Sequence, residues 1–180
     1  MTELASERID PAEIVYRWWA DLTRSAEPGQ PSHRGELAQL RRCKNLEEVL
    51  FVPPYHALYF RTVRAGWGDR LRIAAVAGAL SHLKGEVESS KGFAAFLATP
   101  KEHGQGPRVS ESRFQRLMKE KELNNFYPAL LRVFHLAGEK APLSDLIRGV
   151  YDWGDPFRGD RIRRDWTFAY YNQLLDNQKP

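Results

Sequence analysis

Apolar residues recur with helical spacing along most of the chain, and no segment alternates between apolar and polar residues for long enough to predict a sheet. In the first such segment, Ile14, Trp18 and Leu22 are each four residues apart and form one seam. Asp10-Pro11 stands directly before this seam, where an N-cap and the first helical residue belong. Prolines and glycines separate the segment from those that follow. We therefore predict an all-α fold.

One segment is apolar on nearly every side and is predicted to be the most buried helix of the N-terminal half. It spans residues 70–84, follows Asp69 as a cap, and stops at Gly85. Among the five tryptophans, Trp18 and Trp166 lie on apolar seams and are predicted to pack in the core. Trp67 lies in a loop between two glycines, and both packing and stacking on a nucleobase stay open for it.

A loop divides the predicted helices into two groups. Residues 99–108 (T-P-K-E-H-G-Q-G-P-R) hold two prolines and two glycines and show no helical period. With 180 residues, the chain is long enough for one domain or for two small ones. We predict two small helical bundles joined by this loop, an N-terminal lobe of residues 1–100 and a C-terminal lobe of residues 108–180.

The composition excludes several classes of protein. Cys43 is the only cysteine, so an intrachain disulfide and a zinc site built on thiolates are both ruled out. The five histidines lack the spacing of a metal motif, and the glycines lack that of a phosphate loop. The first ten residues are polar and carry acids, and no apolar run approaches the roughly 18 residues of a membrane span. We expect a cytoplasmic protein that needs no cofactor, metal or membrane.

Candidate catalytic groups are few. Asp145 and Asp152 lie seven residues apart in one predicted helix. They could hold a magnesium ion in a nuclease, although a solvated face is the commoner reason for such a pair. Cys43 shares a helix face with Leu37 and Leu40, which indicates a buried thiol rather than a nucleophile. No catalytic constellation emerges, and we predict that the protein is not an enzyme.

The segment 32–44 is predicted to form a helix that carries arginines away from the core, with Ser32 as its N-cap. Its apolar face holds Leu37, Leu40 and Cys43. Its opposite face, which has no acid among its cations, holds Arg34, Arg41 and Arg42. The planar guanidinium group suits phosphate oxygens better than an ammonium group does. A solvated charged face is the alternative, since the net charge of +4 permits an anionic partner without requiring one.

Several short motifs follow one another in a distinctive order. These are R-G-E-L-A-Q-L-R-R-C, P-P-Y-H-A-L-Y, S-R-F-Q-R-L-M, L-L-R-V-F and R-R-D-W-T-F-A-Y-Y. Over residues 14–172, this order resembles the CasB family, the small subunit of the type I-E CRISPR Cascade surveillance complex. The resemblance implies a non-catalytic all-α protein that sits as a pair of copies beside the backbone and large subunits. It also implies contact with the CRISPR RNA and with target DNA that the guide RNA has opened.

The resemblance implies that arginines of these motifs bind nucleic acid. The closest matches by motif position are Arg41, Arg42, Arg113, Arg116 and Arg132. Looser matches are Arg161, Arg163, Arg164 and Arg70. Asp160 and Asp165 flank the cluster around residue 163, so partial neutralisation is expected there. Arg34 joins the set from the helical face described above. The competing hypothesis is a purely structural helical adaptor that docks its basic face on an acidic protein.

Overall fold

The computed structural model describes residues 9–24, 33–102, 104 and 106–179. Over these residues the chain forms ten α-helices and one sheet of two short strands, which confirms the all-α prediction. Ser32, the predicted N-cap, lies outside the described residues. The helices are α1 (Pro11–Thr23), α2 (Arg34–Arg42), α3 (Leu46–Val49), α4 (Pro53–Arg64), α5 (Arg70–Ser81), α6 (Gly92–Ala98), α7 (Glu111–Lys119), α8 (Leu123–Leu136), α9 (Leu143–Trp153) and α10 (Gly159–Asp176).

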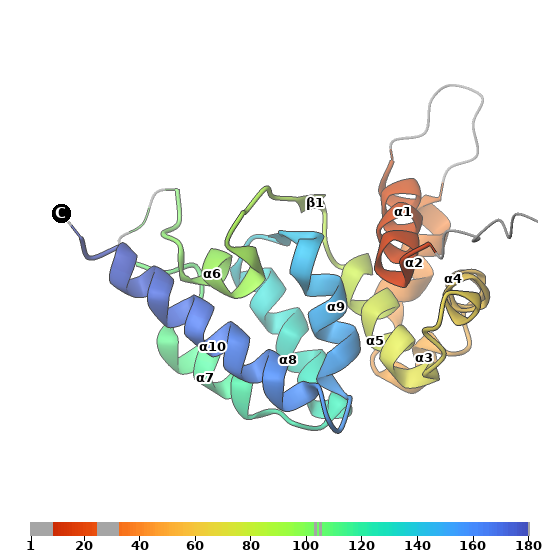
Figure 1. Cartoon of the computed structure of the whole chain (residues 1–180). Helices are drawn as coiled ribbons and strands as arrows, with labels where there is room; N and C mark the ends of the chain where they lie inside the picture. Colours follow the sequence, from red (N-terminus) through yellow and green to blue (C-terminus); the bar gives the residue numbers. More distant parts are fainter. Residues whose placement is uncertain (1–8, 25–32, 103, 105, 180) are drawn as a thin grey trace, which may run out of the picture.

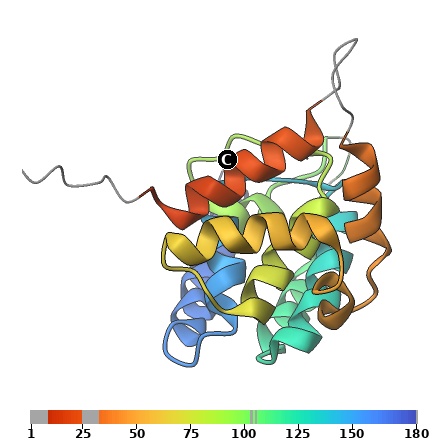
Figure 2. The same ribbon diagram turned by 90° about the vertical axis from the view of Figure 1, so that its right-hand side faces the viewer.

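Helix α5 lies at the centre of the molecule, and all its residues from Ile73 to Ser81 are buried, as the sequence predicts. It contacts α1 to α4 on one side and α8 and α9 on the other (Figure 1). Figure 2, turned by 90°, shows α1 and α4 lying next to each other across this end of the molecule. One continuous cluster of buried apolar side chains runs through both groups of helices.

The strands β1 (Gly85–Glu86) and β2 (Lys140–Ala141) form a parallel pair in which Gly85 is level with Lys140. The prediction of a helix up to Lys84 was therefore wrong at its end, because α5 stops at Ser81 and the chain turns into β1. Two residues per strand are too few to show a strand period in the sequence. Because β1 follows α5 and β2 follows α8, the pair ties the ends of these two helices together.

The two ends of the segment 99–108 lie side by side. The N–H group of Arg108 donates to the carbonyl oxygen of Thr99 at 2.9 Å, and Pro100 forms an antiparallel bridge with Pro107. Helix α6, which precedes this loop, packs on α9 and α10, which follow it. The division into lobes at residues 100 and 108 stays a prediction.

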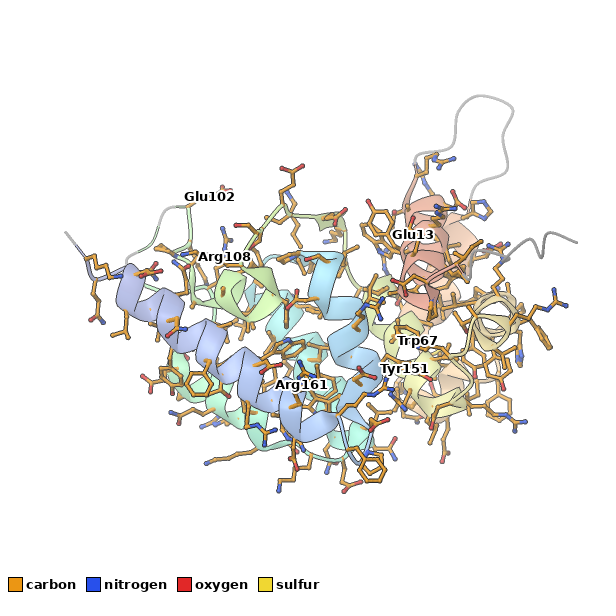
Figure 3. The ribbon with its side chains drawn as sticks, viewed as in Figure 1. Glu13, Trp67, Glu102, Arg108, Tyr151 and Arg161 are labelled. Atoms are coloured by element: carbon orange, nitrogen blue, oxygen red, sulfur yellow. The ribbon has the colours of Figure 1, made fainter. Side chains whose placement is uncertain are left out.

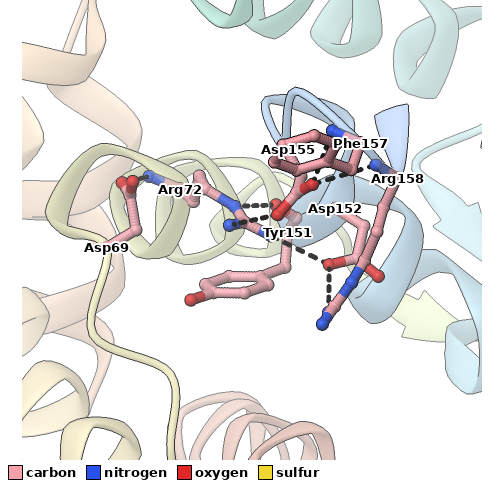
Figure 4. A network of polar contacts seen from close by, with 7 residues as sticks. All are labelled: Asp69, Arg72, Tyr151, Asp152, Asp155, Phe157 and Arg158. Atoms are coloured by element: carbon pink, nitrogen blue, oxygen red, sulfur yellow. Dashed lines mark hydrogen bonds and ion pairs between the residues drawn. The ribbon is translucent and has the colours of Figure 1, made fainter. Parts of the chain in front are cut away.

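Arg72, in the first turn of α5, joins this helix to the end of α9. Its Nη2 atom lies 2.8 Å from Oδ1 of Asp152, and its Nη1 atom lies 3.0 Å from Oδ2 of Asp155 (Figure 4). Its Nε atom donates to the carbonyl oxygen of Tyr151, and its guanidinium carbon lies 3.9 Å from the centre of that tyrosine ring. The three charged side chains are only 13–17% exposed, so water screens these pairs weakly.

Trp67 also packs at this contact between α5 and α9. Its ring lies parallel to that of Tyr151, with 3.8 Å between the ring centres, and the side chain is buried (Figure 3). Of the two roles left open for Trp67, the structure therefore shows packing between α9 and the loop before α5. Trp166 is buried as predicted, and its ring contacts those of Phe93 and Trp153.

Gly149 of α9 allows α10 to come close. A Cβ atom at this position would overlap the indole ring of Trp166. We expect Gly149→Ala to lower the free energy of unfolding by about 1–3 kcal/mol, because the core would have to accept an extra methyl group. Gly35→Ala is the matched control, since a Cβ atom there meets open space and alanine favours the helix. Equal denaturation midpoints for the two variants would contradict this account.

We expect Arg72→Met to lower the free energy of unfolding by about 2–4 kcal/mol, because it leaves two shielded carboxylates without their main partner. Arg148→Met is the control, since Arg148 pairs with Asp10 on the surface and such pairs contribute about 0–1 kcal/mol. Denaturant titration of both variants measures the difference.

The loss of unfolding free energy caused by Arg72→Met should depend on pH. Burial alone would raise the pKa of Asp155, but hydrogen bonds from the backbone of Arg158 and Phe157 and the charge of Arg72 outweigh it and lower the pKa. A depressed carboxyl pKa stabilises the fold above the unfolded value of about 3.9, and the contribution is lost as the pH falls through the folded value. The difference between wild type and Arg72→Met should therefore shrink below about pH 4. A constant difference from pH 7 to pH 3 would assign the effect to packing alone.

Candidate nucleic-acid interface

Helix α2 has the two faces that its sequence predicts. Leu37, Leu40 and Cys43 are buried, and burial raises the pKa of the Cys43 thiol, which disfavours a reactive thiolate. Arg34, Arg41 and Arg42 are all exposed on the outer side of the helix. Arg34 and Arg41 are seven residues apart and share one flank, roughly 10 Å apart along the helix axis.

Arg41 has a structural role that the sequence did not predict. Its Nε atom donates to the carbonyl oxygen of Ser81, the last residue of α5. Carbonyl groups at the end of a helix lack partners within the helix and carry partial negative charge, so a guanidinium group binds them well. The next residue, His82, is partly buried, and burial, together with the charge of Arg41, lowers the pKa of its imidazole. Arg41 therefore fixes α2 to the end of α5, although the residue as a whole is exposed.

Exposed cations continue from the end of α5 to α8. Lys84 pairs with Glu139, and the hydrogen bond and charge of Lys84 lower the pKa of that carboxyl group. Glu139 also lies 3.7 Å from the imidazole of His135 on α8. Arg132 stands three residues before His135, which places both on neighbouring positions of the same helix surface. Arg132 is exposed and has no ion pair within the part of the chain that the structure describes.

We call this surface the α2–α8 strip and define it as Arg41, Arg42, Lys84, Arg132 and His135. Figure 2 shows α2 and α8 on the same side of the molecule, whereas α10 lies on the opposite side. Of the ten predicted arginines, Arg41, Arg42 and Arg132 are thus exposed on helices that lie on this side of the molecule. Lys84 and His135 were missed by sequence reasoning, because only the pairing of β1 with β2 brings them together.

Arg113 and Arg116 of α7 are exposed on a helix that has α10 on one of its flanks. The other flank of α7 faces α10, because Gln115 and Glu111 both bind the hydroxyl group of Tyr171 at 2.8 Å. Residues two positions apart point about 200° apart on a helix, so Arg113 lies on the flank away from α10. Helix α7 packs on α8, and its buried residues are Phe114 and Leu117. Both arginines are exposed, and neither forms an ion pair with a described residue.

The three arginines of α10 are more neutralised, as expected from their flanking acids. Arg161 lies 3.6 Å from Asp165. Arg163 binds Asp160, is only 15% exposed, and lies over the ring of Trp153. In Figure 3, Arg161 stands on the near side of α10, away from the side that carries α8. The sequence-predicted set is therefore not one face.

Two further predicted arginines do not belong to the strip. One lies far from it, and the charge of the other acts on a neighbouring acid. Arg70 is exposed at the first position of α5, roughly 17 Å along the helix from Ser81, and so lies at the opposite end of α5 from the strip. Arg164 is exposed, and its charge acts on Asp160 together with that of Arg163.

The carboxylates considered for a nuclease have structural roles. Oδ1 of Asp145 accepts a hydrogen bond from the N–H group of Phe93 at 2.8 Å, at the start of α6. Burial raises the pKa of Asp145, although this and other hydrogen bonds oppose the shift. Asp152 binds Arg72 and Arg158. Among the described residues, no group of three or more histidine, cysteine or acidic side chains could hold a metal ion, and no helix there is long and apolar enough to cross a membrane.

Comparison with known proteins is consistent with this reading of the fold. A chain in the crystal structure of E. coli Cascade bound to a PAM-containing dsDNA target is similar to this chain, with a TM-score of 0.62 and 19% sequence identity. The match covers 91% of this chain and 96% of that chain, and it shows a shared fold. A comparison with curated proteins found no match.

A family model settles the membership. The model of the CRISPR-associated protein Cse2 family matches residues 36–171, which is most of the 180-residue chain. The matched range begins within α2, spans the α2–α8 strip, and ends within α10. The chain therefore belongs to the Cse2 family of CRISPR-associated proteins, also called CasB, as the order of its sequence motifs predicts.

Proposed function

We propose that this protein is a non-catalytic small subunit of a cytoplasmic type I-E Cascade complex. Its α2–α8 strip would contact the sugar-phosphate backbone of target DNA opened by the CRISPR RNA. Its protein partners would be the backbone and large subunits and a second copy of itself. The Cascade complex that contains the similar E. coli chain holds a double-stranded DNA target, which supports this assignment.

The observation that supports the proposal most strongly is the predominance of positive charge on the strip. Its cations come from α2, the segment after α5, and α8. Among the described residues, the acid that pairs with them is Glu139, which contacts Lys84 and His135. Surface cations on a folded protein usually alternate with acids, as Arg17 does with Glu13 on α1. A strip in which cations predominate, on rigid elements, suits a polyanion.

The proposed role does not require the protein to recognise the base sequence of the DNA. When guide RNA opens a duplex, the heteroduplex that forms is about as stable as the DNA that it replaces, so contacts to the strand backbones tip the balance. Arginines held by a packed helix lose less conformational entropy on binding phosphate than arginines on a mobile arm. Arg42 and Arg132 fit this role best, because within the described part of the chain neither forms a hydrogen bond or ion pair with α5, unlike Arg41.

The adaptor hypothesis is supported by a different observation. Several large apolar side chains are strongly exposed, among them Phe51 at 82%, Phe60 at 63% and Phe157 at 90%. Exposed aromatic residues are typical of surfaces that bind proteins. These residues lie outside the strip, so docking on other subunits and contact with nucleic acid use different surfaces.

We expect Arg42→Ala and Arg132→Ala each to weaken target-DNA binding by the assembled complex to a similar extent on every sequence. Each lost phosphate contact should flatten the log–log dependence of affinity on salt by about 0.7–0.9. The measurement is target-DNA affinity over a salt series. Arg148→Ala is the control, because it removes the same charge from α9, where the guanidinium group already binds Asp10.

An affinity and a salt slope equal to wild type for both strip variants would exclude the strip from the nucleic-acid surface and favour the adaptor hypothesis. Thermal unfolding should be nearly unchanged for both variants, since exposed charges contribute about 0–1 kcal/mol. Arg41→Ala is less suitable, because it also removes the bond from α2 to the end of α5.

A further inference from the structure

A cavity of about 660 Å³ opens at the end of the α2–α8 strip. His135 belongs to both, because its imidazole lines the cavity and lies one turn from Arg132 on α8. The other walls come from three separate parts of the chain. They include Phe96 of α6, Arg108 at the end of the loop of residues 99–108, and Lys140 of β2. A cavity of this size lies in the range that holds small organic ligands.

Arg108 is held in a fixed position beside this cavity. Its Nε atom donates to Oγ1 of Thr99 at 3.1 Å, and its backbone N–H group donates to the carbonyl oxygen of the same residue. Its guanidinium carbon lies 4.7 Å from the centre of the Phe96 ring, which is almost completely buried. One face of the guanidinium group therefore rests on the ring. Its two terminal nitrogens have no partner among the described residues.

We propose that this cavity binds one nucleotide of a single-stranded nucleic acid, with the base stacked on the outer face of the Arg108 guanidinium group. Guanidinium planes and aromatic rings are the platforms on which proteins stack unpaired bases. Phe96 supports the arginine from below and fixes its plane. The inference rests on the proposed function, because the strip brings a strand to the mouth of the cavity.

The charges of the lining favour a nucleotide over a simple anion. Lys101 and Lys140 line the cavity and have no ion pair with a described residue, so they are available to a phosphate group. Glu86 and Glu102 also line it, and Figure 3 places Glu102 and Arg108 at the same end of the molecule. The lining therefore has mixed charge rather than the purely positive charge that suits a free phosphate or an acidic peptide, and Glu86 also accepts a hydrogen bond from the hydroxyl group of Tyr16 at 2.9 Å. A nucleotide also presents exocyclic amino groups, from which a carboxylate accepts hydrogen bonds.

The test compares two single-stranded DNA probes that carry the same number of phosphates, one of deoxycytidines and one wholly abasic. We expect the full-length wild-type protein to bind the deoxycytidine probe roughly 5- to 100-fold more tightly, the range that stacking of one base gives. Arg108→Lys keeps the charge but loses the plane, so this preference should fall to nearly one. Lys140→Gln should weaken binding of both probes equally and leave the preference intact.

The outcomes separate this inference from the proposed function. Salt-sensitive binding of both probes with equal affinity would overturn the nucleotide site and leave the strip in place. A wild-type preference that survives in Arg108→Lys would overturn it too, by placing the stacked base elsewhere. Absence of binding to either probe would overturn the nucleotide site, whereas the strip is tested by the salt series on the assembled complex.

A second measurement does not depend on the folding of a variant. Photo-crosslinking of wild-type protein to an oligonucleotide of 5-iodocytidines should label peptides that contain Arg108 or the residues of β2. Labelling confined to other parts of the chain would contradict the site. Thermal unfolding of Arg108→Lys shows whether the bonds to Thr99 are needed for the fold.

Discussion

The structure depends on the burial of α5 on every side. A helix without a polar face cannot stand at the surface, so other helices must cover it all round. Helices α1 to α4 cover one side, and α8 and α9 cover the other. The first turn of α5 carries two arginines: Arg70 is exposed, whereas the guanidinium group of Arg72 binds Asp152 of α9 and Asp155 of the α9–α10 connection. Arg72 thereby joins the two groups of helices.

The C-terminal end of α5 has a corresponding importance for the proposed function. Its last carbonyl group binds Arg41, and the chain then pairs with β2 through β1, which places Lys84 beside the end of α8. Cations that are far apart in sequence thus form one strip on a surface whose backbone is fixed. Rigid donors are favoured for phosphate binding, because little freedom remains to be lost when a strand arrives.

The proposed nucleotide cavity adds the stacking of a base to the phosphate contacts of the strip. Binding of phosphate groups alone would require only the strip. It would not explain why the guanidinium plane of Arg108 is fixed on the ring of Phe96. The two surfaces therefore predict separable effects, because phosphate contacts respond to salt and stacking responds to the presence of bases. Exposed aromatic residues such as Phe51 and Phe157 lie outside both surfaces and suit protein partners.

The sequence by itself determined the helical class, the caps at Asp10 and Asp69, the burial of α5 and the buried face of α2, because these follow from spacing within single helices. The order of motifs also identified the family. Only the tertiary structure decided the role of Arg72, the closure of the 99–108 loop and the meeting of Lys84 with His135. These depend on contacts between residues about 10 to 80 positions apart, for which one sequence carries no periodic signal. Which arginines share a surface was decided in the same way, since helical spacing fixes the face of a helix but not its neighbours.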